Sequence, residues 1–132
     1  MVRRLVLVFG GLVMTQIAHS TEEYIGRLWE VLPPARFISG LFSSELARGF
    51  LVFNLLVIAL GVFCLLGPVA RGWPSGRPVA WGWSLIELAN GVGHLLLSLA
   101  QGGYVPGLVT APALIVFALL VMHDLRRVAR AV

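Results

Sequence analysis

LVLVFGGLVMTQIAHSTEE, residues 5–23, is an apolar run that ends in a histidine and two adjacent carboxylates. The apolar part is hydrophobic enough to enter a membrane, where a helix needs about 20 such residues. On a helix that turns about 100° per residue, His19, Glu22 and Glu23 share one face. Because ionisable side chains inside a membrane are costly and are functional candidates by default, we interpret these three residues as the centre of a site.

The composition places the whole chain in a membrane. Of its 132 residues, 58% are hydrophobic and 12% are charged, and the mean hydropathy is +0.91. Soluble domains carry about 25% charged residues. The ten basic residues are all arginines and lie singly or in pairs between apolar runs. They therefore indicate contact with lipid headgroups rather than with nucleic acid. The single cysteine, Cys64, cannot form an internal disulfide.

We expect one all-α domain, residues 1–132, built as an integral membrane four-helix up-down bundle that can also form oligomers. Proline and glycine pairs predict the helix ends, with Pro33-Pro34 closing the first span and Gly67-Pro68 the second. Ser44 is the expected N-cap of the second span. The expected spans cover residues 5–29, 47–66, 80–101 and 108–122.

Two features, one in the third span and one just after the fourth, bear on packing and on the C-terminal end. Gly91 and Gly93 are expected to let neighbouring helices approach closely. His123 and Asp124, beside the last arginines, are expected to be a solvated terminus.

The N-terminal segment has a second interpretation. Arg3-Arg4, an apolar core and Ala18-His19-Ser20 resemble a signal peptide with a small-x-small cleavage site. The apolar pattern continues past that site through Tyr24 to Trp29, so a retained helix is the better interpretation.

The arginines also predict the orientation. Four spans put both termini on one side, and the positive-inside rule places the more basic side in the cytoplasm. The opposite side holds three arginines: Arg27, Arg36 and Arg48. The terminal side holds seven: Arg3, Arg4, Arg71, Arg77, Arg126, Arg127 and Arg130. We therefore expect a multi-pass protein of the bacterial inner membrane with both termini in the cytoplasm.

Depth in the membrane predicts which polar residues meet. His19 and His94 each lie about 14 residues into parallel spans, which is roughly 21 Å up at about 1.5 Å per residue. Asn54, on the descending second span, lies at a similar level. We expect one pocket that gathers the polar residues of three spans, with Glu87 as its floor. Its candidate members are His19, Glu22, Glu23, Asn54, Glu87, Asn90 and His94.

Each candidate also has a purely structural interpretation. Glu22 and Glu23 can sit at the headgroup level with Arg27 as their partner. Asn54 can be an interhelical hydrogen-bonding residue, and His94 a packing histidine. Trp83 is assigned to substrate binding, although tryptophans near a helix start commonly anchor a span at the interface.

The motif HSTEE, residues 19–23, resembles the signature of the HXXEE-domain family of small bacterial membrane proteins. The segments NGVGH, residues 90–94, and YVPGLVT, residues 104–110, are similar to the second half of that family. The resemblance implies a membrane domain with a polar active site and carries no settled reaction. Residues 22–27 also match the EExxxR motif of CAAX-type intramembrane proteases, which is a chemical analogy only.

Three functions fit this set of residues. The first is metal-free acid–base catalysis on a lipophilic small molecule, by isomerisation, cyclisation or ring opening. Two neighbouring carboxylates in a low-dielectric site cannot both ionise easily, so one would serve as acid and the other as base. In this mechanism His19 or His94 relays the proton, and Asn54 and Asn90 hold a substrate oxygen.

The second function is a metal-dependent hydrolase. His19, Glu22 and His94 would bind zinc or iron, and Glu23 would activate the metal-bound water. The third is not an enzyme but a small proton-coupled transporter or another membrane protein that needs one membrane carboxylate. The sequence contains no nucleotide, haem or nucleophile-elbow motif, so it leaves the substrate unassigned.

Overall fold

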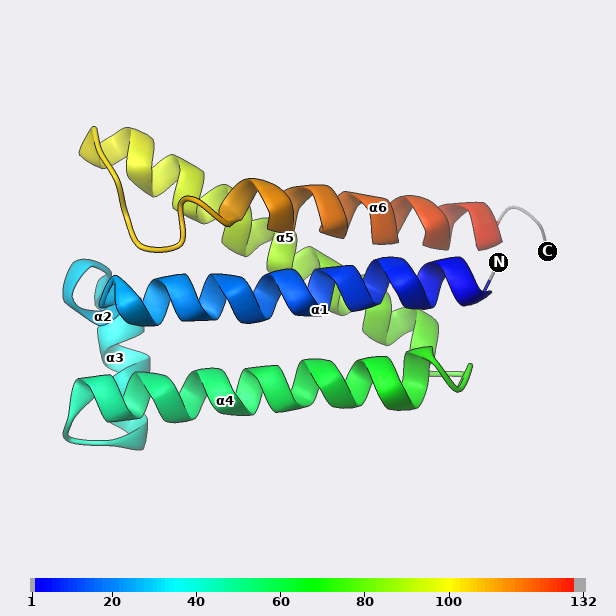
Figure 1. Ribbon diagram of the computed structural model, residues 1–132, viewed down its shortest axis with the longest axis horizontal. Coiled ribbons are helices and arrows are strands. Elements are labelled where there is room, and N and C mark those ends of the chain that lie inside the picture. The colour runs from blue at the N-terminus through cyan, green and yellow to red at the C-terminus, as the bar shows by residue number, and fades with distance from the viewer. Residues whose placement is uncertain (1, 130–132) are drawn as a thin grey trace.

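The computed structural model describes residues 2–129, and within that range the fold is all-helical (Figure 1). Four helices are long, and two short helices connect the first two of them. The helices are α1 (Val2–Ile25), α2 (Leu28–Val31), α3 (Pro33–Phe42), α4 (Leu46–Cys64), α5 (Gly76–Gln101) and α6 (Ala111–Ala129), with a π-helical turn η1 (Leu65–Val69) after α4.

Three helical segments are long and apolar enough to cross a membrane. Among the described residues they cover Arg3–Ile25, Leu46–Val69 and Gly76–Gln101. Their outward faces expose large apolar side chains, including Leu7, Ile25 and Leu99. In water such surfaces would be a liability, whereas in a bilayer they face lipid.

The long helices lie side by side with α1 between α4 and α6 and with α5 crossing behind (Figure 1). Helix α6 packs on both α1 and α5, while α4 contacts α1 and the short helix α3. The main core forms where α1 meets α6, around Phe9, Leu12 and Leu114, which are fully buried. This packing sets the position of α1 against α6 and therefore the direction in which its C-terminal half projects.

The prolines do not end the first two long helices, although this was expected from the sequence. Helix α1 ends at Ile25 because Arg27 adopts a left-handed conformation with φ 57°, and Pro33-Pro34 instead begin α3. Proline suits the first helical turn, where the backbone N–H has no helical partner. Gly67-Pro68 does not stop the second long helix either, since the chain continues through them as the π-helical turn η1.

Two further expectations about helix ends are corrected. Glu45, not Ser44, is the N-cap residue of α4, and the Ser43 hydroxyl accepts its backbone N–H at 3.1 Å. Asp124 is buried rather than solvated, and its Oδ2 lies 3.0 Å from the Arg4 Nε. This ion pair joins the last turns of α6 to the first turn of α1.

Of the two glycines expected at helix contacts, one lies at a contact and the other does not. A Cβ on Gly91 would lie 2.8 Å from the Ile115 Cγ1 and 2.9 Å from the Ala111 carbonyl oxygen of α6. A Cβ on Gly93 would meet nothing within 4 Å. Close approach of α5 to α6 therefore depends on Gly91 alone of this pair.

These glycines provide a matched test of the α5–α6 contact. We expect Gly91→Ala to destabilise the protein by about 1–3 kcal/mol, because the added methyl group overpacks a contact with backbone. Gly93→Ala, two residues away on the same helix, should be neutral or slightly stabilising, since alanine favours helix. Thermal unfolding in detergent measures both variants, and equal melting temperatures for the two would contradict this account of the packing.

Candidate functional site

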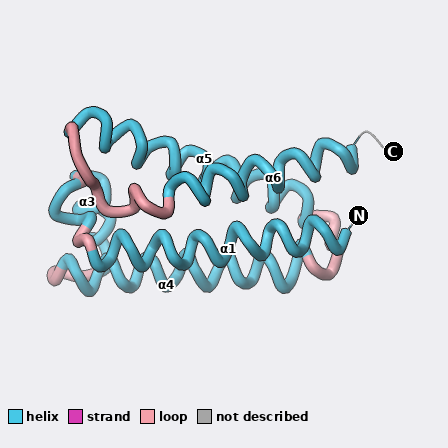
Figure 2. The backbone as a smooth tube through the Cα atoms, turned by 45° about the horizontal axis from the view of Figure 1, so that its top comes forward, coloured by secondary structure: helices cyan, strands magenta, loops and turns pink. Residues whose placement is uncertain are grey.

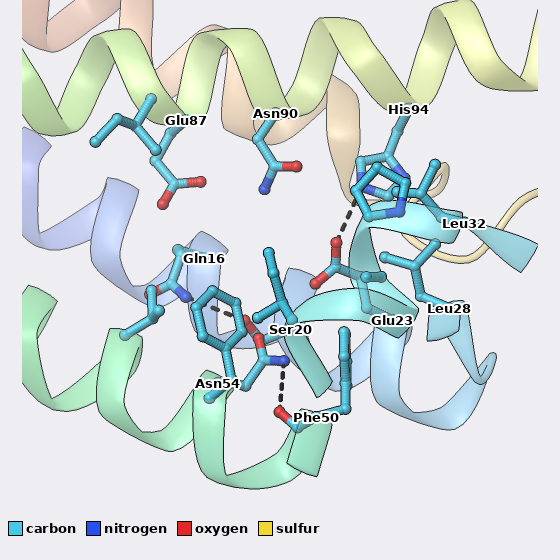
Figure 3. Close-up of a pocket in the computed structure, with 16 residues that line it drawn as sticks. Gln16, Ser20, Glu23, Leu28, Leu32, Phe50, Asn54, Glu87, Asn90 and His94 are labelled. Atoms are coloured by element: carbon cyan, nitrogen blue, oxygen red, sulfur yellow. Dashed lines mark hydrogen bonds and ion pairs between the residues drawn. The ribbon is translucent and has the colours of Figure 1, made fainter. Parts of the chain in front are cut away.

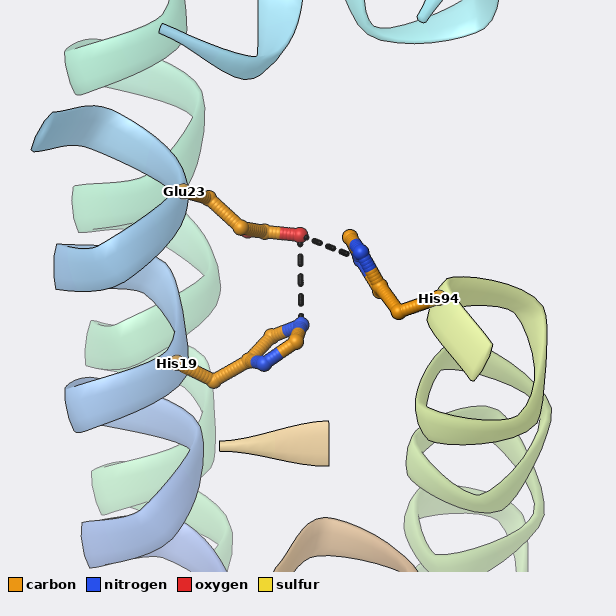
Figure 4. Close-up of side chains that lie close together, drawn as sticks. All are labelled: His19, Glu23 and His94. Carbon is orange, nitrogen blue, oxygen red and sulfur yellow. Dashed lines mark hydrogen bonds and ion pairs between the residues drawn. The ribbon is translucent and has the colours of Figure 1, made fainter. Parts of the chain in front are cut away.

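The C-terminal half of α1 and the middle of α5 bring one carboxylate and two imidazoles together. The Glu23 Oε1 lies 2.9 Å from the His94 Nε2 and 3.2 Å from the His19 Nε2. Figure 4 shows both imidazoles directed at this same oxygen. The two rings meet edge to face with their centroids 4.7 Å apart. We call His19, Glu23 and His94 the His–Glu–His cluster, and all three are buried.

Helix geometry explains why Glu23, and not Glu22, joins this cluster. His19 and Glu23 are four residues apart and so lie one above the other on the same side of α1. Glu22 turns toward the loop of residues 102–110, which folds back from α5 toward the end of α1 (Figure 2). The ligand set expected from the sequence, His19, Glu22 and His94, is therefore not assembled, and Glu23 stands in the place given to Glu22.

Glu22 is held by four donors from that loop. Its Oε1 accepts hydrogen bonds from the Tyr104 hydroxyl at 2.9 Å and from the Val109 N–H at 3.0 Å. Its Oε2 accepts from the Thr110 N–H at 2.9 Å and from the Thr110 hydroxyl at 2.7 Å. Loss of solvent and the hydrogen bond to Glu22 raise the pKa of Tyr104, so this hydroxyl stays a donor. The Glu22 carboxylate thus anchors the loop to α1.

The same threonine fixes the orientation of His19. The His19 Nδ1 lies 2.7 Å from the Thr110 Oγ1. The other neighbours of that hydroxyl are the Glu22 Oε2 and the Gly107 carbonyl oxygen, both of which accept hydrogen bonds. The single hydroxyl hydrogen must go to one of them, so His19 donates from Nδ1. In the neutral ring the Nε2 that faces Glu23 then carries a lone pair.

With this tautomer, the neutral His19 ring has no proton on Nε2 to donate to the Glu23 carboxylate. The His94 Nε2 can donate to the Glu23 Oε1, but the His19 Nε2 lone pair would face a carboxylate oxygen 3.2 Å away. Within residues 2–129, the His19 Nε2 is a buried atom with no hydrogen-bond partner. Two acceptors at this distance repel each other unless a proton or a cation lies between them. The cluster is therefore built to hold an added positive charge.

A close contact with the loop completes the cluster. Gly107 has a positive φ of 94°, and a Cβ there would lie 2.6 Å from the His94 Cε1 and 2.8 Å from the His19 Cε1. Only glycine combines that backbone conformation with so close an approach to both rings.

A cavity of about 350 Å³ opens beside the cluster, between α1, α4 and α5 (Figure 3). Its walls are mostly apolar and come from α2 to α5. Its polar lining residues are Gln16, Ser20, Glu23, Asn54, Glu87, Asn90 and His94. Small-molecule sites have this volume and this mixture of apolar walls and a few polar groups.

The structure brings most of the sequence candidates to this cavity. Glu87 is 2% exposed, and its Oε2 has no hydrogen-bond partner among the described residues. Asn90 lies between Glu87 and His94 on α5, with its amide directed into the cavity (Figure 3). Asn54, from α4, donates to the Phe50 carbonyl oxygen of its own helix at 3.0 Å. Carboxylate, amide and imidazole groups thus form one polar strip against apolar walls.

Two assignments and one alternative interpretation from the sequence differ from the structure. Trp83 does not line the cavity; it packs against α4 at Gly61, where a Cβ would lie 2.9 Å from its ring. Arg27 pairs with Glu30 at 2.8 Å and with neither motif glutamate. Glu22 serves the loop and is not a cavity residue.

Two cavity residues were missed by the sequence reasoning. The Gln16 Nε2 donates to the Ser20 Oγ at 3.0 Å, and both side chains are buried against the cavity. Their spacing contained the signal, because residues 16, 20 and 23 recur at four and three residues and so follow one face of α1.

These features define a small helical protein that has three helical segments long and apolar enough to cross a membrane and a buried His–Glu–His cluster beside a cavity. The chain belongs to the family described as protein of unknown function with HXXEE motif, whose model matches residues 11–122. His19, Glu22 and Glu23 supply the lettered positions of that motif. Comparisons with curated proteins and with solved structures returned no match.

Thr110 provides a test of the hydrogen bonds that orient His19. We expect Thr110→Val, which keeps the shape and removes the hydroxyl, to destabilise the protein by about 1–3 kcal/mol because the buried His19 N–H loses its acceptor. Thr110→Ser should retain most of the stability. Thr21→Val, which removes an exposed hydroxyl bonded to the Ile17 carbonyl of α1, is the matched control and should change little. Thermal unfolding in detergent is the measurement, and a Thr110→Val protein as stable as the control would contradict the assignment.

Proposed function

We propose that the protein is a membrane-embedded enzyme that performs acid–base chemistry on a lipophilic small molecule in the cavity. The observation that carries the proposal is the presence of two buried carboxylates in one apolar-walled cavity: Glu23 within the His–Glu–His cluster, and Glu87, whose Oε2 has no hydrogen-bond partner among the described residues. Burying such groups in a membrane helix costs about 2.5–3.5 kcal/mol each on insertion scales, which favours a functional reason for keeping them.

The lining of the cavity favours a neutral substrate. None of the residues that line it is an arginine or a lysine, although the chain has ten arginines. A phosphate or carboxylate headgroup would therefore meet Glu23 and Glu87 without an arginine or lysine side chain to offset its charge. Apolar side chains such as Leu32, Phe53 and Val57 would contact a hydrocarbon skeleton. Alcohols, epoxides and unsaturated ketones of lipid-like character fit both conditions.

The two ends of the polar strip would have different roles. Glu87 is the proposed base, since its Oε2 has no competing hydrogen bond from residues 2–129. The His–Glu–His cluster is the proposed electrophilic end, where the added positive charge stabilises negative charge that develops on a substrate oxygen. Asn90, between them, would orient the substrate, with Asn54 on the facing helix. Isomerisation and cyclisation need only such proton movements, whereas hydrolytic ring opening also consumes one water molecule.

Turnover of neutral lipids tests this proposal. Purified protein in lipid nanodiscs is incubated with the neutral-lipid fraction of the source organism, and products are followed by mass spectrometry. We expect one lipid to be replaced by an isomer or by a species that differs by one water. Glu87→Gln and Glu23→Gln should each slow this conversion by about 10²–10⁴-fold, the usual contribution of a general acid or base.

The matched control is Glu30→Gln, which removes an exposed carboxylate outside the cavity. It should convert the lipid at the wild-type rate. Unchanged conversion in Glu87→Gln would refute the role of Glu87, and proton-coupled uptake into vesicles that requires Glu23 would favour a transporter instead.

We further propose that α6 is a fourth span and that the long helices form an up-down bundle in the bacterial inner membrane. Successive long helices run in opposite directions (Figure 1), and α6 packs along α1 and α5. The excess of arginines on the side of the termini favours a cytoplasmic location for both ends.

Reporter fusions test this orientation. Alkaline phosphatase is active only outside the cytoplasm, so a fusion after residue 132 should be inactive and a fusion after residue 103 should be active. Green fluorescent protein at the same two points should give the opposite pattern. The reverse result at both points would place the termini outside.

A further inference from the structure

We propose that the His–Glu–His cluster is a binding site for one divalent first-row transition ion, with zinc as the expected metal. The inference rests on the function proposed above in one respect: the ion would be the positive charge at the electrophilic end of the cavity. Binding of the ion can be measured without turnover. The proposed ligands are the Nε2 atoms of His19 and His94 and a carboxylate oxygen of Glu23.

The geometry of the three groups fits such an ion. One potential ligand atom from each of His19, Glu23 and His94 lies within 4.8 Å of the others. The two contacts to the Glu23 Oε1 measure 2.9 and 3.2 Å. In a tetrahedral zinc site with bonds of about 2.0–2.1 Å, neighbouring ligand atoms lie roughly 3.3 Å apart. Small side-chain rotations therefore suffice to admit the ion between the three groups.

The His19 Nε2 supplies an independent argument for a ligand. His19 is 0% exposed, and its Nε2 has no hydrogen-bond partner among residues 2–129. Its Nδ1 is engaged with Thr110 at 2.7 Å, so the lone pair must lie on Nε2 in the neutral ring. A buried lone pair directed at a carboxylate oxygen is unfavourable alone. An ion bonded to both atoms turns that repulsion into coordination.

The hydrogen bond at the His19 Nδ1 is of the kind that orients metal-bound histidines. Such residues almost always donate their second ring N–H to an acceptor that fixes the ring orientation. Here the acceptor is the Thr110 hydroxyl, which is in turn hydrogen-bonded to Glu22. All three lettered residues of the HXXEE motif then have a role, with His19 and Glu23 as ligands and Glu22 as a positioning residue.

Charge balance favours a cation in the cluster. Glu23 and Glu87 are buried, and the cavity lining contains no basic residue apart from His94. Arg27, the nearest arginine in sequence, is paired with Glu30. A divalent ion would offset the charge of Glu23 and reduce the repulsion between the two carboxylates.

Three protein ligands are the number found in catalytic zinc sites, where the fourth position is left for water or substrate. Glu23 and His94 both line the cavity, so this fourth position would open toward a bound lipid. The ion would then act as a Lewis acid on a substrate oxygen. The same ligand set also suits iron, which makes metal identity one readout of the experiment.

Metal analysis of the whole protein tests the inference. The full chain is purified in detergent from cells grown with added zinc, and metals are measured by mass spectrometry. We expect about one zinc or iron ion per chain. After removal of metal with a chelator, titration with Co²⁺ should produce the visible absorption of a tetrahedral cobalt site.

Variants assign the site to the cluster. His19→Ala, His94→Ala and Glu23→Gln should each abolish stoichiometric binding. Glu22→Gln and Thr110→Val should weaken affinity by about 10–100-fold, as changes around metal ligands do. His123→Ala is the matched control, because His123 is exposed and lies outside the cluster, and it should bind as the wild type does. Thermal unfolding of each variant with and without zinc separates loss of the site from loss of the fold, since only an intact site is stabilised by the ion.

The inference is overturned if the wild type neither retains an ion nor binds added Zn²⁺ or Co²⁺ at micromolar concentration. It is also overturned if binding survives in both His19→Ala and His94→Ala. These failures differ from failure of the proposed function. Glu87-dependent turnover in a metal-free protein would reject the ion and keep the enzyme, whereas stoichiometric binding without any lipid turnover would keep the ion and reject the enzyme.

Discussion

The contact of the Glu23 carboxylate with two imidazoles from different helices is the interaction on which the arrangement of the site depends. It joins α1 to α5 at one point within the apolar part of the molecule. A buried carboxylate without partners would be strongly unfavourable there, so the positions of His19 and His94 are constrained by Glu23. The same convergence creates the need for an added positive charge, because the lone pair of His19 faces the carboxylate. The contacts that hold the cluster together and the charge imbalance within it therefore have one physical origin.

The two adjacent glutamates of the motif have different partners because they lie on different faces of α1. Glu23 faces α5 and the cavity, while Glu22 faces the loop of residues 102–110. By accepting four hydrogen bonds from that loop, Glu22 brings Thr110 to His19 and Gly107 against both imidazoles. The loop is thus part of the site although it contributes no cluster residue. A substitution of Glu22 would act through Thr110 on the orientation of His19.

The sequence predicted much of this site for simple reasons. Polar residues in apolar helices are few, and their depth follows from the rise per residue, so the meeting of His19 and His94 could be expected from counting alone. Periodicity placed Glu87, Asn90 and His94 on one face of α5. The same rules could not separate Glu22 from Glu23, since both lie within one turn of His19. They also could not place Trp83, which packs against Gly61 rather than lining the cavity, because an aromatic residue near a helix start can face lipid, a cavity or another helix.

The sequence by itself determined the all-helical class, the membrane-compatible helices and the family, because hydrophobicity, helical period and the motif are local properties of the chain. Only the tertiary structure decided which glutamate meets the histidines, that Gly91 rather than Gly93 allows α5 to approach α6, and that Arg27 pairs with Glu30. It also decided that the first long helix ends at Ile25, well before Pro33, and that the second continues through Pro68 to Val69. These outcomes depend on the rotation of each helix about its axis and on the path of the loops. Both are set by packing between segments far apart in the chain, which no local pattern records.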